Sequence, residues 1–169
     1  MKNILLSIDF SEYAEQVALF TAELAQQAQA RLILFYAYNP TPPANGEEDN
    51  QSISERWAQA RLDRLAGKIR KETTVSVTRL LKPGNLQDVT YEVTSKVKAD
   101  IIILCQDEAL NLPTLLLDSP LSLRYTHPNN TPTITMSSTN NPNPDSIKPA
   151  LAELLNLKGY DTSPLLDAV

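Results

Sequence analysis

The chain has 169 residues, of which 42% are apolar and 21% are charged, and its formal net charge is −5. This composition is typical of a globular protein, and the length suits one domain with a core plus an appendage. Acidic balance excludes DNA, RNA and anionic membranes as general partners, because phosphate groups require a clustered positive surface. The single cysteine, Cys105, excludes an intramolecular disulfide. No apolar run approaches the roughly 18–20 residues of a membrane span, so the expected location is the cytoplasm.

The first part of the chain predicts two strands with a helix between them. Residues 4–8 form a near-continuous apolar run, which indicates a central parallel strand rather than a signal peptide. Ser11 follows as a helix N-cap, and apolar residues recur at helical spacing over residues 12–30. Residues 31–38 predict a second strand. Residues 39–50, with three prolines and three consecutive acids, predict a surface loop.

The middle of the chain continues the alternation of helices and strands. A helix is predicted over residues 51–72, in which Trp57 is either a core residue or a contact between elements. Residues 75–81 are β-branched and partly alternating, which favours a strand near a sheet edge. A turn at 82–85 leads to a helix over residues 86–97. The most apolar strand follows at residues 101–104.

The last predicted elements have weaker sequence patterns. Residues 112–125 predict a short helical segment that two prolines interrupt. Residues 131–136 predict a final strand, in which Pro132 marks either an edge strand or a strand start. Residues 133–136 are short and apolar enough to pair with a second copy of themselves. We therefore expect the chain to form a homodimer through this strand.

A change in composition separates a tail from the main domain. Residues 1–137 form the predicted α/β domain, residues 138–145 a linker rich in Ser, Thr, Asn and Pro, and residues 146–169 a C-terminal helical tail. A helix over residues 146–157 would carry one apolar face. That face must pack on its own domain, on a second subunit or on a protein partner, and docking within a homodimer is the simplest choice. Its residues are Ile147, Leu151, Leu154 and Leu155.

Strands that alternate with helices predict a doubly wound, five-stranded parallel sheet of the α/β class, with the C-terminal helix as an extension. Ligands of such sheets bind beyond the carboxyl ends of the strands, at the point where the strand order reverses. Asp9 and Cys105 both follow the carboxyl end of a predicted strand.

Three segments resemble the universal stress protein family over residues 1–137. Residues 4–12 resemble its first strand and Asp-x-Ser turn, here Asp9-Phe10-Ser11, and residues 30–38 resemble its second strand. Residues 99–119 match the frame of its phosphate loop, in which a strand leads into Gly-x2-Gly-x9-Gly-Ser/Thr. Gly84 fits the glycine after the third strand. The resemblance implies a doubly wound fold and a dimer.

The phosphate loop lacks its glycines. The three glycine positions fall on Cys105, Glu108 and Asp118, and only Ser119 fits the motif. Glycine allows backbone N–H groups to approach phosphate oxygens, whereas these side chains obstruct the approach and two of them are acidic. The sequence therefore predicts a degenerate nucleotide-binding motif, loss of ATP binding and no cofactor.

The resemblance also implies a residual pocket. Its residues are Asp9 on the adenosine side, Ala37 near the adenine, and Ser119 as the phosphate-side hydroxyl. Asp9 could equally help to cap the following helix. Asp9 could also join Asp107, Glu108 and Asp118 in a cation site, although their spacing matches no metal motif and favours a solvated acidic loop.

We expect no catalytic residue and no metal site. Cys105 is either redox-active or a small buried residue, and the second alternative is favoured. His127 is the only histidine, and it precedes a proline in a loop with no obvious partner. ATP hydrolysis would need a glycine loop, a lysine at the phosphates and a placed base. The predicted function is a dimeric interaction or regulatory protein, and the alternative is a binder of a small molecule or adenosine-type ligand. The C-terminal helix is a candidate surface for a protein partner.

Overall fold

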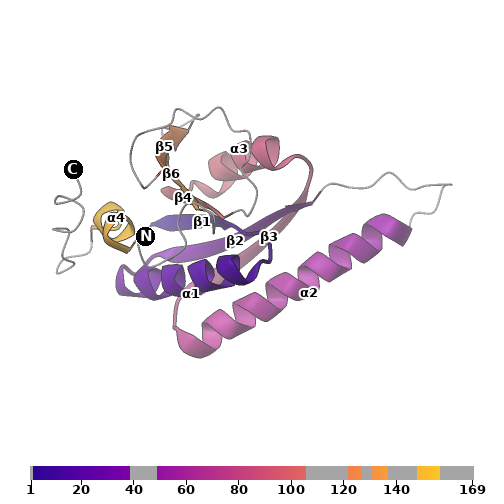
Figure 1. Cartoon of the computed structure of the whole chain (residues 1–169), viewed down its shortest axis with the longest axis horizontal. Helices are drawn as coiled ribbons and strands as arrows, with labels where there is room; N and C mark the ends of the chain where they lie inside the picture. Colours follow the sequence, from indigo (N-terminus) through magenta and orange to yellow (C-terminus); the bar gives the residue numbers. More distant parts are fainter. Residues whose placement is uncertain (1, 39–48, 106–121, 127–130, 137–147, 157–169) are drawn as a thin grey trace.

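The computed structural model describes residues 2–38, 49–105, 122–126, 131–136 and 148–156 (Figure 1). Strands and helices alternate through most of these residues, as the sequence predicts. In chain order the elements are β1 (Asn3–Ser7), α1 (Glu12–Gln27), β2 (Arg31–Tyr38), α2 (Asp49–Glu72), β3 (Ser76–Pro83), α3 (Leu86–Val97), β4 (Ile101–Cys105), β5 (Ser122–Thr126), β6 (Thr131–Met136) and α4 (Lys148–Leu154).

The strands form one sheet in the order β3-β2-β1-β4-β6-β5. The first five of these pair in parallel, and β5 pairs antiparallel with β6. The predicted five-stranded parallel sheet is confirmed, and β3 lies at its edge as expected. The strand β5 is an addition to that prediction.

The strand β5 corrects one element of the sequence prediction. Residues 112–125 were expected to be helical, but the last four of them, 122–125, belong to the strand β5. Their sequence, Ser-Leu-Arg-Tyr-Thr, also alternates as a strand does, and pairing satisfies the backbone groups along the outer side of β6. The remaining residues of that predicted helix, 112–121, lie outside the described residues.

The expected dimer contact through the last strand is also corrected. Residues 133–136 of β6 pair with β4, and residues 131–135 pair with β5 on the other side. Because both sides of β6 are hydrogen-bonded within the chain, its backbone is not available to a second copy. Pro132 is the second residue of β6, so the strand-start alternative is confirmed.

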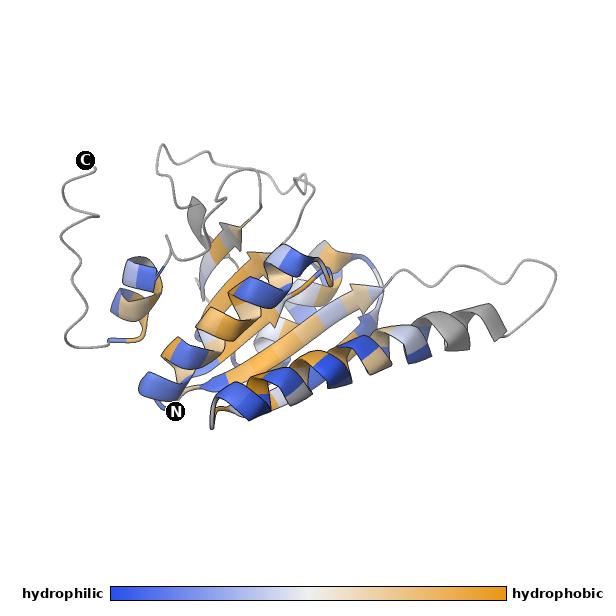
Figure 2. Ribbon diagram, turned by 60° about the horizontal axis from the view of Figure 1, so that its bottom comes forward, coloured by the Kyte–Doolittle hydropathy of each residue, from blue (hydrophilic) through white to orange (hydrophobic). Residues whose placement is uncertain are grey.

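Helices cover both faces of the sheet. One cluster of buried side chains joins α1, α2 and α4 to one face, and a second cluster joins α3 to the other. Figure 2 shows the strands mostly in the hydrophobic colour and the outward side of α2 mostly in the hydrophilic colour. This division follows from right-handed crossovers, which place α1 and α2 on one side and α3 on the other after the chain reverses direction.

The C-terminal helix α4 packs on its own chain. Leu151 is fully buried and Leu155 is 5% exposed, and both belong to the cluster formed with α1 and α2. The Lys2 ammonium donates a hydrogen bond of 2.6 Å to the Leu154 carbonyl, at the end of a helix with no basic residue in its last turn. The prediction of a docked helix is confirmed, and the cover is the chain's own domain rather than a second subunit, which was expected as the simplest choice. The helix α4 spans Lys148–Leu154, and residues 146, 147 and 157 of the predicted helix lie outside the described residues.

The structure agrees with a predicted helix cap and a predicted turn. Ser11 caps α1, since its hydroxyl accepts a hydrogen bond of 3.1 Å from the Ala14 N–H. Gly84 has a φ of +131° and donates its N–H to the Tyr38 carbonyl at 2.8 Å, which joins the ends of β3 and β2. Within the described residues, no helix is long and apolar enough to cross a membrane.

Candidate functional site

The candidate site lies at the carboxyl edge of the sheet, where the strand order reverses. Strand β1 is flanked by β2 on one side and β4 on the other, and Ser7 of β1 pairs with both Phe35 and Leu104. Asp9, just after β1, and Cys105, the last residue of the neighbouring strand β4, therefore lie at the same edge, as the sequence predicts. This is the usual ligand position in doubly wound sheets.

Asp9 organises the turn that leads into α1. Its Oδ1 accepts hydrogen bonds from the Ser11 backbone N–H at 3.0 Å and from the Ser11 hydroxyl at 2.6 Å. The Ser11 hydroxyl in turn accepts the bond from Ala14 that caps the helix. Asp9 thus supports the helix cap, which is one of the two roles considered for it. Its role as a ligand anchor stays a prediction.

The other predicted pocket residues are less clearly placed together. Ala37 lies near the carboxyl end of β2, where it pairs with Lys82 of β3 and packs against the cluster on the α3 side. Its neighbour Tyr36 packs with the opposite cluster. Ser119 lies outside the described residues, so the phosphate side of the predicted pocket stays a prediction.

Cys105 is a buried residue at the end of β4. Its side chain is 1% exposed and belongs to the core cluster on the α1 and α2 side, and its backbone position pairs with Met136. The prediction of a small buried side chain is confirmed, because a reactive thiol requires access to solvent. Among the described residues, no group of three or more His, Cys, Asp or Glu side chains could hold a metal ion. Asp107, Glu108 and Asp118 of the considered cation site, and His127, lie outside these residues.

An aromatic and cationic cluster beside Asp9 was missed by the sequence analysis. The Phe10 ring lies 4.5 Å from the Tyr36 ring and 5.6 Å from the Trp57 ring, between centroids. The Arg61 guanidinium lies 5.5 Å from the Phe10 centroid and 5.2 Å from the Trp57 centroid, within cation–π range. Arg61 also donates a hydrogen bond of 3.2 Å to the Phe10 carbonyl. The one available signal was the spacing of Trp57 and Arg61, which places both on one face of a helix.

The backbone of Phe10 lies in the left-handed region, with a φ of 61°. This conformation is uncommon for a bulky residue, and the contacts of Phe10 with Tyr36, Trp57 and Arg61 compensate for its cost. Trp57 is 52% exposed, so it is a contact between elements and not a core residue. Burial raises the pKa of the Tyr36 hydroxyl, and the negative charge of Asp9 raises it further.

An open groove runs from this cluster along the space between α1 and α2. Its volume is about 580 Å³, and its floor includes the apolar residues Ile8, Phe10, Ala14 and Leu65. One ion pair crosses it, since the Lys68 ammonium lies 2.5 Å from Glu15 Oε1 of α1. The hydrogen bond to Glu15 raises the pKa of Lys68. The basic residues that line the groove, all on α2, are Arg61, Arg64, Lys68 and Lys71.

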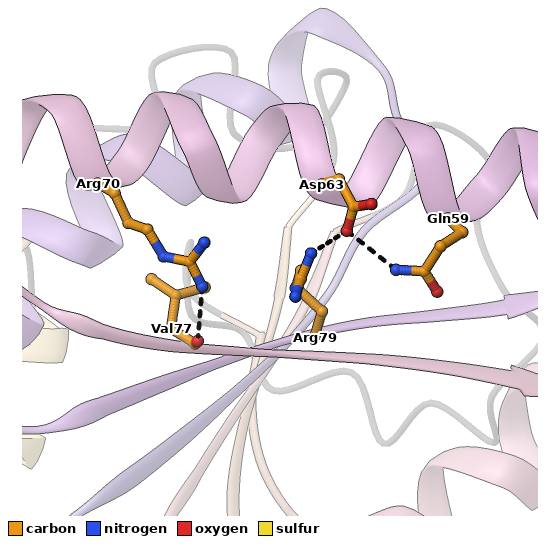
Figure 3. Close-up of polar contacts among 5 residues, drawn as sticks. All are labelled: Gln59, Asp63, Arg70, Val77 and Arg79. Atoms are coloured by element: carbon orange, nitrogen blue, oxygen red, sulfur yellow. Dashed lines mark hydrogen bonds and ion pairs between the residues drawn. The ribbon is translucent and has the colours of Figure 1, made fainter.

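The side of α2 that faces β3 carries different contacts (Figure 3). Asp63 forms an ion pair with Arg79 of β3 and accepts a hydrogen bond of 3.0 Å from Gln59. Arg70 donates a hydrogen bond of 3.4 Å to the Val77 carbonyl. These contacts fix α2 against the edge strand, and Asp63 also lines the groove.

Comparison with known proteins agrees with this fold. The model of the universal stress protein family matches residues 1–120. A universal stress protein of Thermus aquaticus is 33% identical over 108 residues, which are 61% of this chain and 75% of that protein. A family protein from Burkholderia pseudomallei has a similar fold, with a TM-score of 0.53 and 19% identity, over 61% of this chain and 80% of that one.

A universal stress protein family structure from Arabidopsis thaliana, described with AMP bound, has a TM-score of 0.52 at 10% identity. It covers 81% of this chain and 92% of its own. The family model covers most of the chain, and the strand order and helix placement agree with the resemblance found in the sequence. The chain belongs to the universal stress protein family.

Proposed function

We propose that this protein is a non-enzymatic interaction or regulatory member of its family that has lost ATP binding. The observation that carries this proposal is the replacement of the three loop glycines by Cys105, Glu108 and Asp118. Backbone N–H groups can cradle phosphates only where no side chain obstructs them, and two carboxylates would repel the phosphate oxygens. A catalytic role in ATP hydrolysis would need the same cradle.

Two described residues, Cys105 and Asp9, bear on the loss of ATP binding. The Cys105 side chain stands at a motif glycine position at the end of β4 but is buried in the core, so the obstruction of the phosphates is assigned to Glu108 and Asp118. The Asp9 carboxylate holds the turn into α1 through both the N–H and the hydroxyl of Ser11. A ligand that recruited Asp9 through that same oxygen would compete with the helix cap.

A second candidate function is binding of an adenosine-type or other small ligand with less charge than ATP. The observation that favours it is the AMP in the similar Arabidopsis structure. Asp9 and Ala37 stand at the same edge of this sheet, so the adenosine side of the pocket could persist without the phosphate side. In this candidate, Ser119 would contact the ligand near its ribose or phosphate end.

The proposal includes a cytoplasmic homodimer. Its interface is not the backbone of β6, because β4 and β5 occupy both sides of that strand. The C-terminal helix is also not a free apolar surface, since its leucines pack on the chain's own core. Partner binding therefore requires another surface.

Native mass spectrometry of the gently purified protein tests the proposal, because it reports subunit count and retained ligand together. We expect the mass of a dimer with no nucleotide. Retained AMP or adenosine would favour the second candidate, and retained ATP would contradict the first. Phosphate release from ATP above background, abolished in a matched variant, would contradict the assignment as a non-enzyme.

A further inference from the structure

The groove between α1 and α2 is lined by a regular row of positive charge. Arg61, Arg64, Lys68 and Lys71 follow one another at intervals of three, four and three residues, which places them along one face of α2. The row runs beside the buried apolar row of Ala58, Leu62, Leu65 and Ile69. On α2, the basic residues that line the groove therefore lie next to the apolar residues that pack into the core.

Three acidic groups lie near this row. Glu15 pairs with Lys68, and Asp63, which also lines the groove, pairs with Arg79 of β3 (Figure 3). Glu72 follows Lys71 directly and interacts electrostatically with Lys68. Arg64 and Lys71 are exposed, and the described part of the chain contains no ion-pair partner for either of them. The groove therefore keeps uncompensated positive charge in a protein whose net charge is −5.

The dimensions of the row distinguish between kinds of ligand. Arg61 and Lys71 are ten positions apart on α2, which corresponds to about 15 Å along a helix. A single phosphate or carboxylate could contact only a part of this row. A peptide segment with several carboxylates at helical spacing could contact all of it.

The floor of the groove favours a peptide over a nucleic acid. Ile8, Ala14 and Leu65 are almost completely buried, so the apolar surface open to a ligand comes from the partly buried Phe10 and the neighbouring Trp57. The Phe10 ring lines the same groove and touches the half-exposed Trp57. Tryptophan and arginine are the residue types that dominate binding at protein interfaces.

We propose that the groove between α1 and α2 is a docking surface for an acidic, amphipathic peptide segment of a protein partner. This inference rests on the proposed interaction function, and it names the surface and the chemistry of the partner. Apolar side chains of the segment contact Phe10 and Trp57, and its carboxylates pair with Arg64 and Lys71. Complementary charge at such a rim accelerates association and sets the register of the bound segment.

The test uses the full-length protein and a fluorescein-labelled synthetic peptide of about 12 residues, long enough to span the row as a helix. The peptide carries Glu and Leu at helical spacing, and a control peptide carries Lys in place of Glu. Fluorescence anisotropy measures binding of both peptides and of a labelled single-stranded oligonucleotide of similar length. With an unlabelled peptide, the emission of Trp57, the only tryptophan, gives an independent readout.

Matched charge reversals locate the site. The test variant combines Arg64→Glu with Lys71→Glu. The control variant combines Arg31→Glu with Lys98→Glu, which changes the net charge equally at two exposed positions on the amino edge of the sheet. Circular dichroism and thermal melting verify folding, and Arg64→Gln with Lys71→Gln provides a milder variant of the same site.

We expect the acidic peptide to bind the wild type, and its dissociation constant to rise at least about tenfold in the test variant and less than about twofold in the control. The glutamine pair should show an intermediate rise, and added salt should weaken binding. Equal losses in both reversal variants, no binding to the wild type, or equal binding of the oligonucleotide would overturn the proposal. Calorimetry with ATP separates the two claims: weak ATP binding without peptide binding removes only this docking surface.

Discussion

The packing of α4 on the domain gives a prediction with a magnitude. Leu151→Ala removes most of a fully buried side chain from the contact between α4 and the core. Such substitutions cost about 2–5 kcal/mol. Because α4 is at the end of the described chain and has few neighbours, we expect the cost to appear as local opening of this helix.

Amide hydrogen exchange measures that opening at Leu155, whose N–H donates to the Leu151 carbonyl at 3.0 Å. Since about 1.4 kcal/mol corresponds to a tenfold change, exchange should accelerate by roughly 30- to 4,000-fold, up to the rate of an unprotected amide. Lys2→Met removes the hydrogen bond to the Leu154 carbonyl. Its expected cost of about 1 kcal/mol gives roughly a fivefold acceleration.

Glu153→Ala is the control, because Glu153 is on the exposed side of the same helix. It should change exchange at Leu155 by less than about threefold, since surface substitutions are usually within about 0.5 kcal/mol. Amides of β4, such as that of Ile103, should keep their protection in all three variants. Equal exchange at Leu155 in Leu151→Ala and Glu153→Ala would refute the packing argument.

Four further predictions concern stability. Gly84→Ala should lower the free energy of unfolding by at least about 1 kcal/mol, because Gly84 has a φ of +131° and a Cβ there would lie 2.7 Å from Val89 Cγ2. Gly67→Ala, in open space on α2, should instead raise it by about 0.5–1 kcal/mol, and equal effects in urea titrations would contradict this. Ser11→Ala should cost about 0.5–2 kcal/mol in the same assay through loss of the α1 cap, and a change below about 0.3 kcal/mol would count against it. The Tyr36 pKa is above its ordinary value of 10.0, so above pH 10 the folded state keeps a proton that the unfolded state loses. The free energy of unfolding should therefore fall above pH 10 less steeply in Tyr36→Phe than in the wild type.

The sequence predicts the parallel sheet well because its strands are buried on both faces. The segments around Leu5, Leu34 and Ile103 are continuous apolar runs, and such runs alternating with helical spacing leave few alternative topologies. The Ser11 cap and the Gly84 turn are also readable, since each depends on one residue type at one position. The sequence shows that the apolar face of α4 must be buried, but it does not show which surface buries it.

Other features depend on contacts that a linear pattern does not contain. The strand β5 forms because β6 offers a hydrogen-bonding edge, and this tertiary pairing overrides the weak helical signal of residues 122–125. The cluster of Phe10 with Trp57 and Arg61 joins residues about fifty positions apart. Asp9 illustrates a further limit, because an acid after a strand has the same sequence pattern whether it binds a ligand or holds a turn.

Isothermal titration calorimetry with magnesium-ATP tests the loss of ATP binding most directly. The comparison is between the wild type and a variant in which Cys105→Gly, Glu108→Gly and Asp118→Gly restore the family motif. We expect no measurable heat of binding, or millimolar affinity, for the wild type and tighter binding for the variant, because the phosphates then meet backbone N–H groups without obstructing carboxylates. A dissociation constant in the low micromolar range for the wild type would contradict it.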